Sequence, residues 1–157
     1  LRPETYGTVD EAQAAMGLAR AGGCTPRTGE VLLAVQRTLY TLMAEVAAAG
    51  QAGSPFAGAM TAAHVEELEG WLAEFGQSVE MPRELVVPGD SPPGAALHLA
   101  RTVVRRAERL AARLAADGLL ENQQLVRYLN RLSSLLFVLA LYEDQAAGRD
   151  LTLARET

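Results

Sequence analysis

The sequence contains no lysine, one cysteine and only 5% aromatic residues. The lone Cys24 excludes a disulfide within the chain and suits a reducing compartment. The only two histidines, His64 and His98, stand far from each other and from Cys24, so we expect no metal site. All 14 basic residues are arginines, and 19 acidic residues outnumber them, which gives a net charge of −5. This balance argues against general nucleic-acid or anionic-membrane binding.

Long apolar runs are also missing. No run reaches the roughly 18 residues that a membrane span needs, and the N-terminus does not have the pattern of a signal peptide. We therefore expect a cytoplasmic protein that contacts no membrane. A chain of 157 residues, 49% of them hydrophobic and few of them aromatic, suits one domain of packed helices.

Capping residues and glycines predict where the helices begin and end. Thr8, followed by Glu11 three residues later, is typical of a capping box. Thr25, Thr61 and Ser91 each precede a helical pattern in the manner of an N-cap. The predicted helices span residues 8–21, 25–49, 61–76, 91–117 and 121–147. The fold class is therefore all-α, a five-helix bundle forming a single domain over residues 1–157, with a frayed tail from about residue 149.

The last predicted helix has the clearest pattern. Its apolar residues recur every seven positions in two series, Leu125, Leu132, Leu139 and Tyr128, Leu135, Tyr142. This spacing is typical of left-handed bundle packing. A helix that is apolar all round is either central or shared with another subunit. Asn130, which we expect to be buried, and Ser134 lie on a second flank of this helix.

The helix over 91–117 carries a cationic face opposite its apolar stripe. At about 100° per residue, five polar side chains fall within roughly a quarter-turn: His98, Arg101, Arg105, Glu108 and Arg109. Guanidinium groups on one face repel one another, and a phosphate would relieve this repulsion. The face could equally be solvated surface, and His98 a structural hydrogen-bonding residue. No nucleophile accompanies it, so such a site would bind and orient anionic ligands.

Three blocks resemble the signature of the PduO-type ATP:cob(I)alamin adenosyltransferases. They read YGTVDEAQAAMGLAR, LHLARTVVRRAER after a Pro-Gly turn, and YLNRLSSLLFVLA, in the order of that family and spanning Tyr6 to Tyr142. The resemblance implies a homotrimer of five-helix bundles with active sites between subunits. Its expected ligands are ATP (with Mg) and cobalamin. The enzymes it resembles transfer the adenosyl group of ATP to the cobalt of cob(I)alamin, and the protein supplies positioning and charge stabilisation.

The resemblance assigns catalytic and nucleotide-binding roles to individual residues. Arg101 and Arg105 would lie at the nucleotide and the subunit interface. Asp10 would pair with Arg105 of a neighbouring chain. Glu108 and Asn130 would complete the ATP site.

The corrinoid-side positions depart from the family pattern. Leu85 stands where the family has an aromatic residue, PGG reads PGD at Asp90, and RLSD reads RLSS at Ser134. We therefore expect the nucleotide half to be better preserved than the corrinoid half. The alternative is a non-adenosylating homologue that binds ATP, a corrinoid or another ligand. A glycine loop bearing threonine and lysine upstream of Leu1, where this sequence begins, would favour the enzyme.

Overall fold

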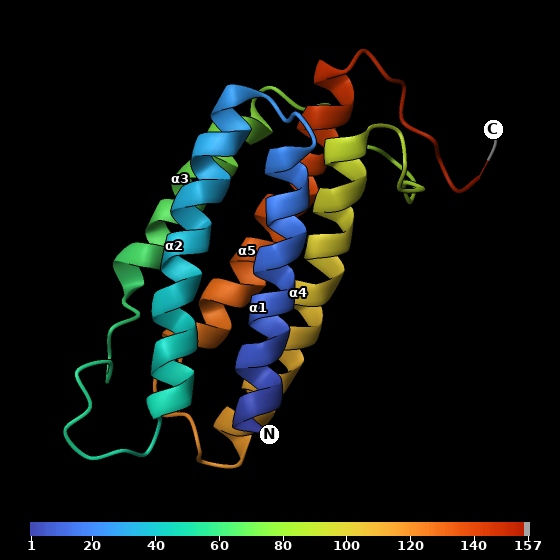
Figure 1. The fold of residues 1–157 in the computed structure, drawn as a ribbon. Coiled ribbons are helices and arrows are strands. Elements are labelled where there is room, and N and C mark those ends of the chain that lie inside the picture. The colour runs from blue at the N-terminus through green and yellow to red at the C-terminus, as the bar shows by residue number, and fades with distance from the viewer. Residues whose placement is uncertain (156–157) are drawn as a thin grey trace.

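Five helices form an elongated bundle in the computed structural model, which describes residues 1–155 (Figure 1). The helices are α1 (Arg2–Ala21), α2 (Pro26–Ala48), α3 (Ala62–Gly76), α4 (Pro92–Ala116) and α5 (Gln124–Ala146). Helix α4 packs between α1 and α5, α2 lies against α1, and α3 lies against α5. The predicted all-α class is confirmed.

Three predicted helix starts are confirmed. Thr25, Thr61 and Ser91 are the N-cap residues of α2, α3 and α4. The hydroxyl of Ser91 accepts a hydrogen bond from the backbone N–H of Gly94 at 3.0 Å, as the sequence pattern predicts for an N-cap. A histidine completes the cap of α3, because the N–H of Thr61 donates to Nδ1 of His64 at 3.0 Å.

The predicted start at Thr8 is wrong. Helix α1 begins six residues earlier, at Arg2, and Pro3 in its first turn is a start signal that the capping-box prediction overlooked. The hydroxyl of Thr8 donates to the carbonyl of Glu4 at 2.7 Å, which is a bond made inside a helix. Glu11 pairs with Arg106 of α4 instead of capping.

Helix α5 is the central element of the core. Leucines of both predicted seven-residue series are fully buried, and so is Tyr128. This burial takes place within one chain, because α3 and α4 cover α5. The first of the two predicted alternatives, a central helix, is therefore confirmed, and the apolar circumference of α5 is in itself no evidence for a second subunit.

Two helices are long and apolar enough to cross a membrane by length and composition, although none was expected from the sequence. They are α2 and α5, each with a window of mean hydropathy 1.3. In α5, 61% of that window is buried inside the bundle, and in α2 39% is. Core packing accounts for the hydropathy of α5, since the core helix of a bundle has the same composition.

Two adjacent carboxylates near the end of α5 hold the starts of two other helices. The carboxylate of Glu143 accepts from the N–H of Thr25 at 2.5 Å, and that of Asp144 accepts from the hydroxyl of Ser91 at 2.6 Å. Both side chains are buried, and burial raises the pKa of each above its ordinary value. The polar end of α5 thus fixes the N-termini of α2 and α4.

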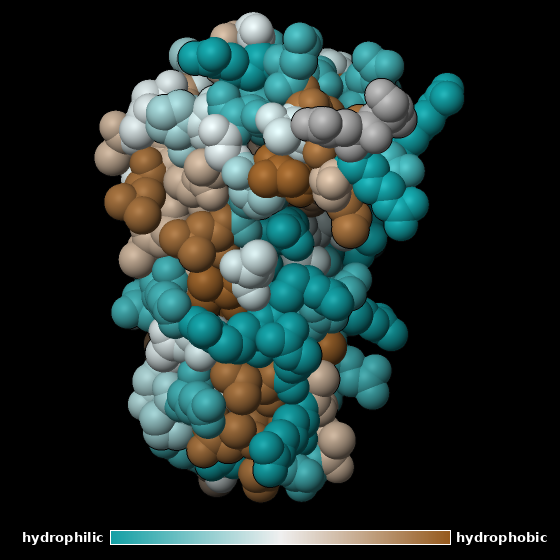
Figure 2. Space-filling model, turned by 90° about the vertical axis from the view of Figure 1, so that its right-hand side faces the viewer, coloured by the Kyte–Doolittle hydropathy of each residue, from teal (hydrophilic) through white to brown (hydrophobic). Residues whose placement is uncertain are grey.

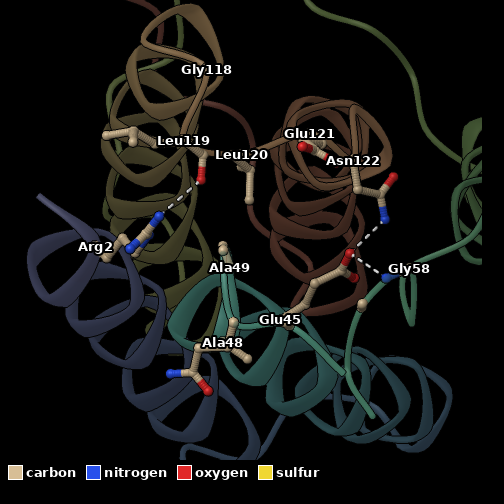
Figure 3. Close-up of a pocket in the computed structure, with 14 residues that line it drawn as sticks. Arg2, Glu45, Ala48, Ala49, Gly58, Gly118, Leu119, Leu120, Glu121 and Asn122 are labelled. Carbon is tan, nitrogen blue, oxygen red and sulfur yellow. Dashed lines mark hydrogen bonds between the residues drawn. The ribbon is translucent and has the colours of Figure 1, made fainter. Parts of the chain in front are cut away.

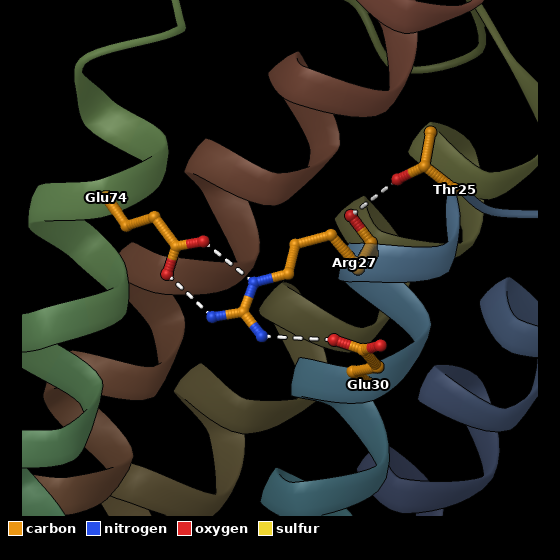
Figure 4. Close-up of polar contacts among 5 residues, drawn as sticks. Thr25, Arg27, Glu30 and Glu74 are labelled. Atoms are coloured by element: carbon orange, nitrogen blue, oxygen red, sulfur yellow. Dashed lines mark hydrogen bonds and ion pairs between the residues drawn. The ribbon is translucent and has the colours of Figure 1, made fainter.

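An exposed arginine ties α2 to α3. Arg27 donates to both carboxylate oxygens of Glu74, at 2.7 and 2.8 Å, and to Glu30 at 3.1 Å (Figure 4). The hydrogen bonds from Arg27 lower the pKa of Glu74. Because all three side chains are solvated, the network orients α3 more than it stabilises the fold.

The predicted frayed tail is wrong for the part that the structure describes. Residues 151–154, called here the C-terminal strap, run antiparallel to residues 85–87, with a bridge between Val86 and Leu153. The partner segment lies more than 60 positions away in the sequence, so local pattern could not reveal the pairing. Residues 156–157, the end of the predicted tail, lie outside the described residues.

Candidate functional site

The carboxylate of Glu108 joins two of the predicted nucleotide residues. One oxygen accepts from Nη1 of Arg105 at 2.6 Å, and the other accepts from Nδ2 of Asn130 at 2.9 Å. The side chain of Glu108 is only 15% exposed, whereas that of Arg105 is 47% exposed. Glu108 therefore fixes the Asn130 amide and leaves part of the Arg105 guanidinium open to a ligand.

A cavity of about 360 Å³ lies beside this cluster, between α3, α4 and α5. Glu108 and Asn130 line it together with Val65, Glu69, Val126, Arg127 and Arg131. Arg131 reaches across the cavity wall to Glu69 of α3, with Nη2 and Oε2 3.2 Å apart. Asn130 is exposed, so the expectation that it is buried is wrong: it lies on the flank of α5 that faces this cavity.

Arg101 lies one turn before Arg105 and is more deeply placed. Its Nε is buried and has no hydrogen-bond acceptor among residues 1–155. A buried guanidinium donor without an acceptor is costly, so this position is suited to an acceptor from a ligand or another chain.

His98 is buried, with 3% of its surface exposed, rather than lying on the solvated face with the arginines. Its ring meets that of Phe137 edge-on at 6.0 Å, and neither ring nitrogen has a hydrogen-bond partner within the described chain. Burial lowers the pKa of His98, and the charge of Arg101 lowers it further, while Asp90 opposes the shift. His98 is thus kept neutral beside Arg101.

Asp10 is exposed on α1. Its neighbour Glu11 forms the ion pair that connects α1 to α4, through Arg106. The ion pairs within residues 1–155 do not include Asp10. The predicted pairing of Asp10 runs between chains, so a single chain does not test it.

The predicted corrinoid-side residues lie at two places. Leu85, with 80% of its surface exposed, and Asp90 belong to the segment that leads into α4. The carboxylate of Asp90 accepts two bonds from Thr152 of the strap. Ser134 is half-buried on α5, three residues before Phe137.

A larger cavity, of about 710 Å³, lies at the end of the bundle where the α2–α3 and α4–α5 loops meet (Figure 3). The buried Glu45 accepts there from the N–H groups of Gly58 and Met60 and from the amide of Asn122, at 2.8–2.9 Å. These bonds satisfy the carboxylate and clamp the two loops. None of the predicted site residues lines this cavity. Sequence reasoning missed Glu45, whose only signal was that it is the one charged residue of α2 after Arg37.

Within residues 1–155, no three His, Cys, Asp or Glu side chains come together in a way that could hold a metal ion. The groups gathered around the middle of α4 are the guanidiniums of Arg101 and Arg105, the carboxylate of Glu108, the Asn130 amide and the neutral imidazole of His98.

The chain belongs to the cobalamin adenosyltransferase family, because the sequence model of that family matches residues 1–143. It is 37% identical over 149 residues to the cobalamin adenosyltransferase of Cupriavidus metallidurans, covering 94% of this chain and 77% of that protein. It is 35% identical over 146 residues to the corrinoid adenosyltransferase PduO of Salmonella typhimurium, covering 93% of this chain but only 43% of that relative.

The fold is also similar to that of solved members of this family. A PduO-type ATP:corrinoid adenosyltransferase from Lactobacillus reuteri, solved as a single-site variant in complex with cobalamin and ATP, superposes with a TM-score of 0.88. Its sequence is 27% identical, and the match covers 99% of this chain and 86% of that one. The resemblance inferred from the three sequence blocks is thereby confirmed.

Proposed function

We propose that this protein is a corrinoid adenosyltransferase, which transfers the 5′-deoxyadenosyl group of ATP to the cobalt of cob(I)alamin. The observation that carries the proposal is the Arg105–Glu108–Asn130 cluster, beside Arg101, in a chain that belongs to this family. In the reaction the reduced cobalt attacks C5′ of ATP, a cobalt–carbon bond forms, and the bond from C5′ to the triphosphate oxygen breaks. The chain itself supplies no nucleophile for this step.

The arginines fit the nucleotide part of the reaction. Negative charge builds on the leaving triphosphate, and permanently charged planar donors such as Arg101 and Arg105 stabilise it. Asn130 has donor and acceptor atoms suited to the sugar or base, and Glu108 holds it in place. Magnesium would be held by the phosphate oxygens and water, as is usual for this ion.

The corrinoid would lie at the end of α4 that carries Leu85 and Asp90. The exposed Leu85 offers an apolar contact to the flat face of the macrocycle. A leucine is smaller and more flexible than an aromatic ring, so it would close that face only in part. We therefore expect adenosylation that is slow compared with ATP binding.

Assembly as a homotrimer is part of the proposal, since it would place an acceptor from a neighbouring subunit near the arginines. The predicted pair is Asp10 with Arg105. The contacts within this chain favour Arg101 as the partner of Asp10, because Arg105 already bonds to Glu108 while Nε of Arg101 is buried without an acceptor. The use of ATP and the single cysteine are consistent with a cytoplasmic enzyme.

Titration calorimetry with ATP tests the nucleotide half directly. The wild-type protein should bind ATP, and Arg101→Ala should abolish detectable binding because a desolvated charged bond is lost. Arg37→Ala, an exposed arginine on α2, is the matched control and should bind ATP like the wild type. Equal ATP binding by Arg101→Ala and wild type would refute the assignment. Absent binding in both, when each is prepared with any residues that precede Leu1 in the gene product, would favour a non-adenosylating homologue that binds a corrinoid or another ligand.

A further inference from the structure

The C-terminal strap holds the segment that carries Leu85 by backbone bonds. The N–H of Val87 donates to the carbonyl of Thr152 at 2.7 Å, and the N–H of Ala154 donates to the carbonyl of Leu85 at 2.8 Å. Both segments lie at the end of the bundle where α4 begins (Figure 1). The backbone around Leu85 is therefore paired on one side, although it precedes a helix rather than belonging to a sheet.

This pairing determines the direction in which each of the three side chains of residues 85–87 points. Successive side chains of an extended segment point to opposite faces. Val86 packs against the core, while Leu85 and Val87 are 80% and 43% exposed. The segment paired with the strap thus presents the side chains of Leu85 and Val87 outward on the same face. Figure 2 views the side of the molecule that carries α4 and the strap, and it shows apolar surface among polar side chains in the upper half of that face.

One side chain anchors the strap. The carboxylate of Asp90 accepts from the N–H of Thr152 at 2.9 Å and from its hydroxyl at 2.6 Å. The bond from the Thr152 hydroxyl lowers the pKa of Asp90 most, and the bond from its N–H lowers it further. The carboxylate is therefore charged at neutral pH. Asp90 directly precedes Ser91, whose hydroxyl donates to Asp144 of α5. The anchor is therefore attached to the rigid junction of α4 and α5.

We propose that Asp90 is a positioning residue for corrinoid binding: by clamping Thr152 it holds the strap against residues 85–87 and fixes Leu85 and Val87 as an apolar platform for the macrocycle. The inference rests on the proposed function. The fixed backbone compensates in part for the small side chain at Leu85, because a preorganised contact loses less conformational entropy on binding than a mobile one. Asp90 acts through the strap and need not touch the ligand.

Amide hydrogen exchange tests the clamp without any ligand. The amides of Val87 and Ala154 report on the strap, since they bond to backbone carbonyls and not to Asp90. In Asp90→Ala both should exchange about tenfold faster or more, the change expected from a loss of about 1.4 kcal/mol of local stability. Asp90→Asn keeps one acceptor oxygen, so its exchange rates should lie between those of the wild type and those of Asp90→Ala. Asp150→Asn, an exposed carboxylate beside the strap, is the control and should exchange like the wild type. Unchanged exchange in Asp90→Ala overturns the clamp.

Equilibrium binding of a corrinoid then tests whether Asp90 acts as a positioning residue. Cob(II)alamin binding, followed by absorbance, should weaken about five- to tenfold in Asp90→Ala, whereas the ATP dissociation constant should stay within twofold. Equal corrinoid binding despite faster exchange would overturn the positioning role. Loss of ATP and corrinoid affinity together would show a general structural defect and would also overturn it. If the wild type binds no corrinoid while exchange confirms the clamp, the failure lies with the proposed function.

Discussion

The amide of Asn130 donates to Oε1 of Glu108 at 2.9 Å, which ties the first half of α5 to the middle of α4. The other oxygen of the same carboxylate holds Arg105. A single acidic side chain thus sets the relative positions of two residues that the proposed function places on the nucleotide. The family resemblance named Glu108 as an ATP ligand, and its contacts suggest in addition that it orients the other two.

Replacing Glu108 should therefore weaken nucleotide binding through its neighbours. In Glu108→Gln the new amide N–H₂ would face the donors of Arg105 or Asn130. We expect the ATP dissociation constant to rise roughly tenfold, because a charged hydrogen bond is worth about 1.5–3 kcal/mol. Calorimetry measures this change. Glu66→Gln, on the exposed face of α3, is the control, and an unchanged affinity in Glu108→Gln would show that the cluster does not orient the nucleotide site.

The partner of Asp10 can be found with two double-mutant cycles. We expect Asp10→Ala to weaken assembly, measured by light scattering, because it leaves a buried guanidinium unpaired. The cycle with the true partner should give a coupling free energy above about 1 kcal/mol, and the cycle with the other arginine less than about 0.5 kcal/mol. Coupling to Arg101 would agree with the contacts within the chain, and coupling to Arg105 with the sequence prediction. A stable monomer at micromolar concentration would contradict both.

Gly94 should not tolerate a side chain. A Cβ at this position would lie 2.8 Å from the hydroxyl of Ser91 and would overlap the carboxylate of Asp144. Gly94→Ala should therefore break the junction of α4 and α5 and lower the free energy of unfolding by about 1–3 kcal/mol. Gly70→Ala is the matched control, since a Cβ added there would meet no atom within 4 Å. It should stabilise α3 by about 0.4–1 kcal/mol. Denaturant unfolding compares the two, and equal stabilities would contradict the geometry.

The two buried carboxylates should make stability depend on pH. Burial raises the pKa of Glu143 and of Asp144 in the folded state, against the opposing bonds from Thr25 and Ser91. A carboxyl with a raised folded pKa contributes stability that is complete below its unfolded pKa and is lost as pH rises through its folded pKa. Glu143→Gln should therefore become more stable relative to wild type as pH rises from about 4.5, near the unfolded pKa. Parallel pH profiles for the two proteins would exclude this effect.

The helix pattern was largely predictable because its signals are local. Thr25, Thr61 and Ser91 stand directly before the helices that they cap, and the leucine series of α5 repeats every seven residues. Thr8 misled because a threonine inside a helix can bond to the preceding turn, so its residue type alone does not mark a start. The buried state of His98 was missed because its neighbour Phe137 comes from another helix.

The candidate site was predictable only in part, for the same reason. The motif identified Arg105, Glu108 and Asn130, but not that one carboxylate would join them across 22 positions. The contact of Asp90 with Thr152 of the strap spans 62 positions, and the sequence pattern of the tail by itself predicts a polar, unstructured segment. Sequence spacing conveys which residues share a helix face, whereas contacts between distant segments depend on the packing of the whole chain.

Formation of adenosylcobalamin from ATP and chemically reduced cobalamin tests the central claim most directly. We predict that the wild-type protein, prepared with any residues that precede Leu1 in the gene product, forms adenosylcobalamin and triphosphate in equal amounts. The reaction should be slow, should be faster in Leu85→Phe, whose ring closes more of the macrocycle face, and should be absent in Arg101→Ala. No adenosylcobalamin from a wild-type protein that binds both ATP and cob(II)alamin would contradict the proposed function.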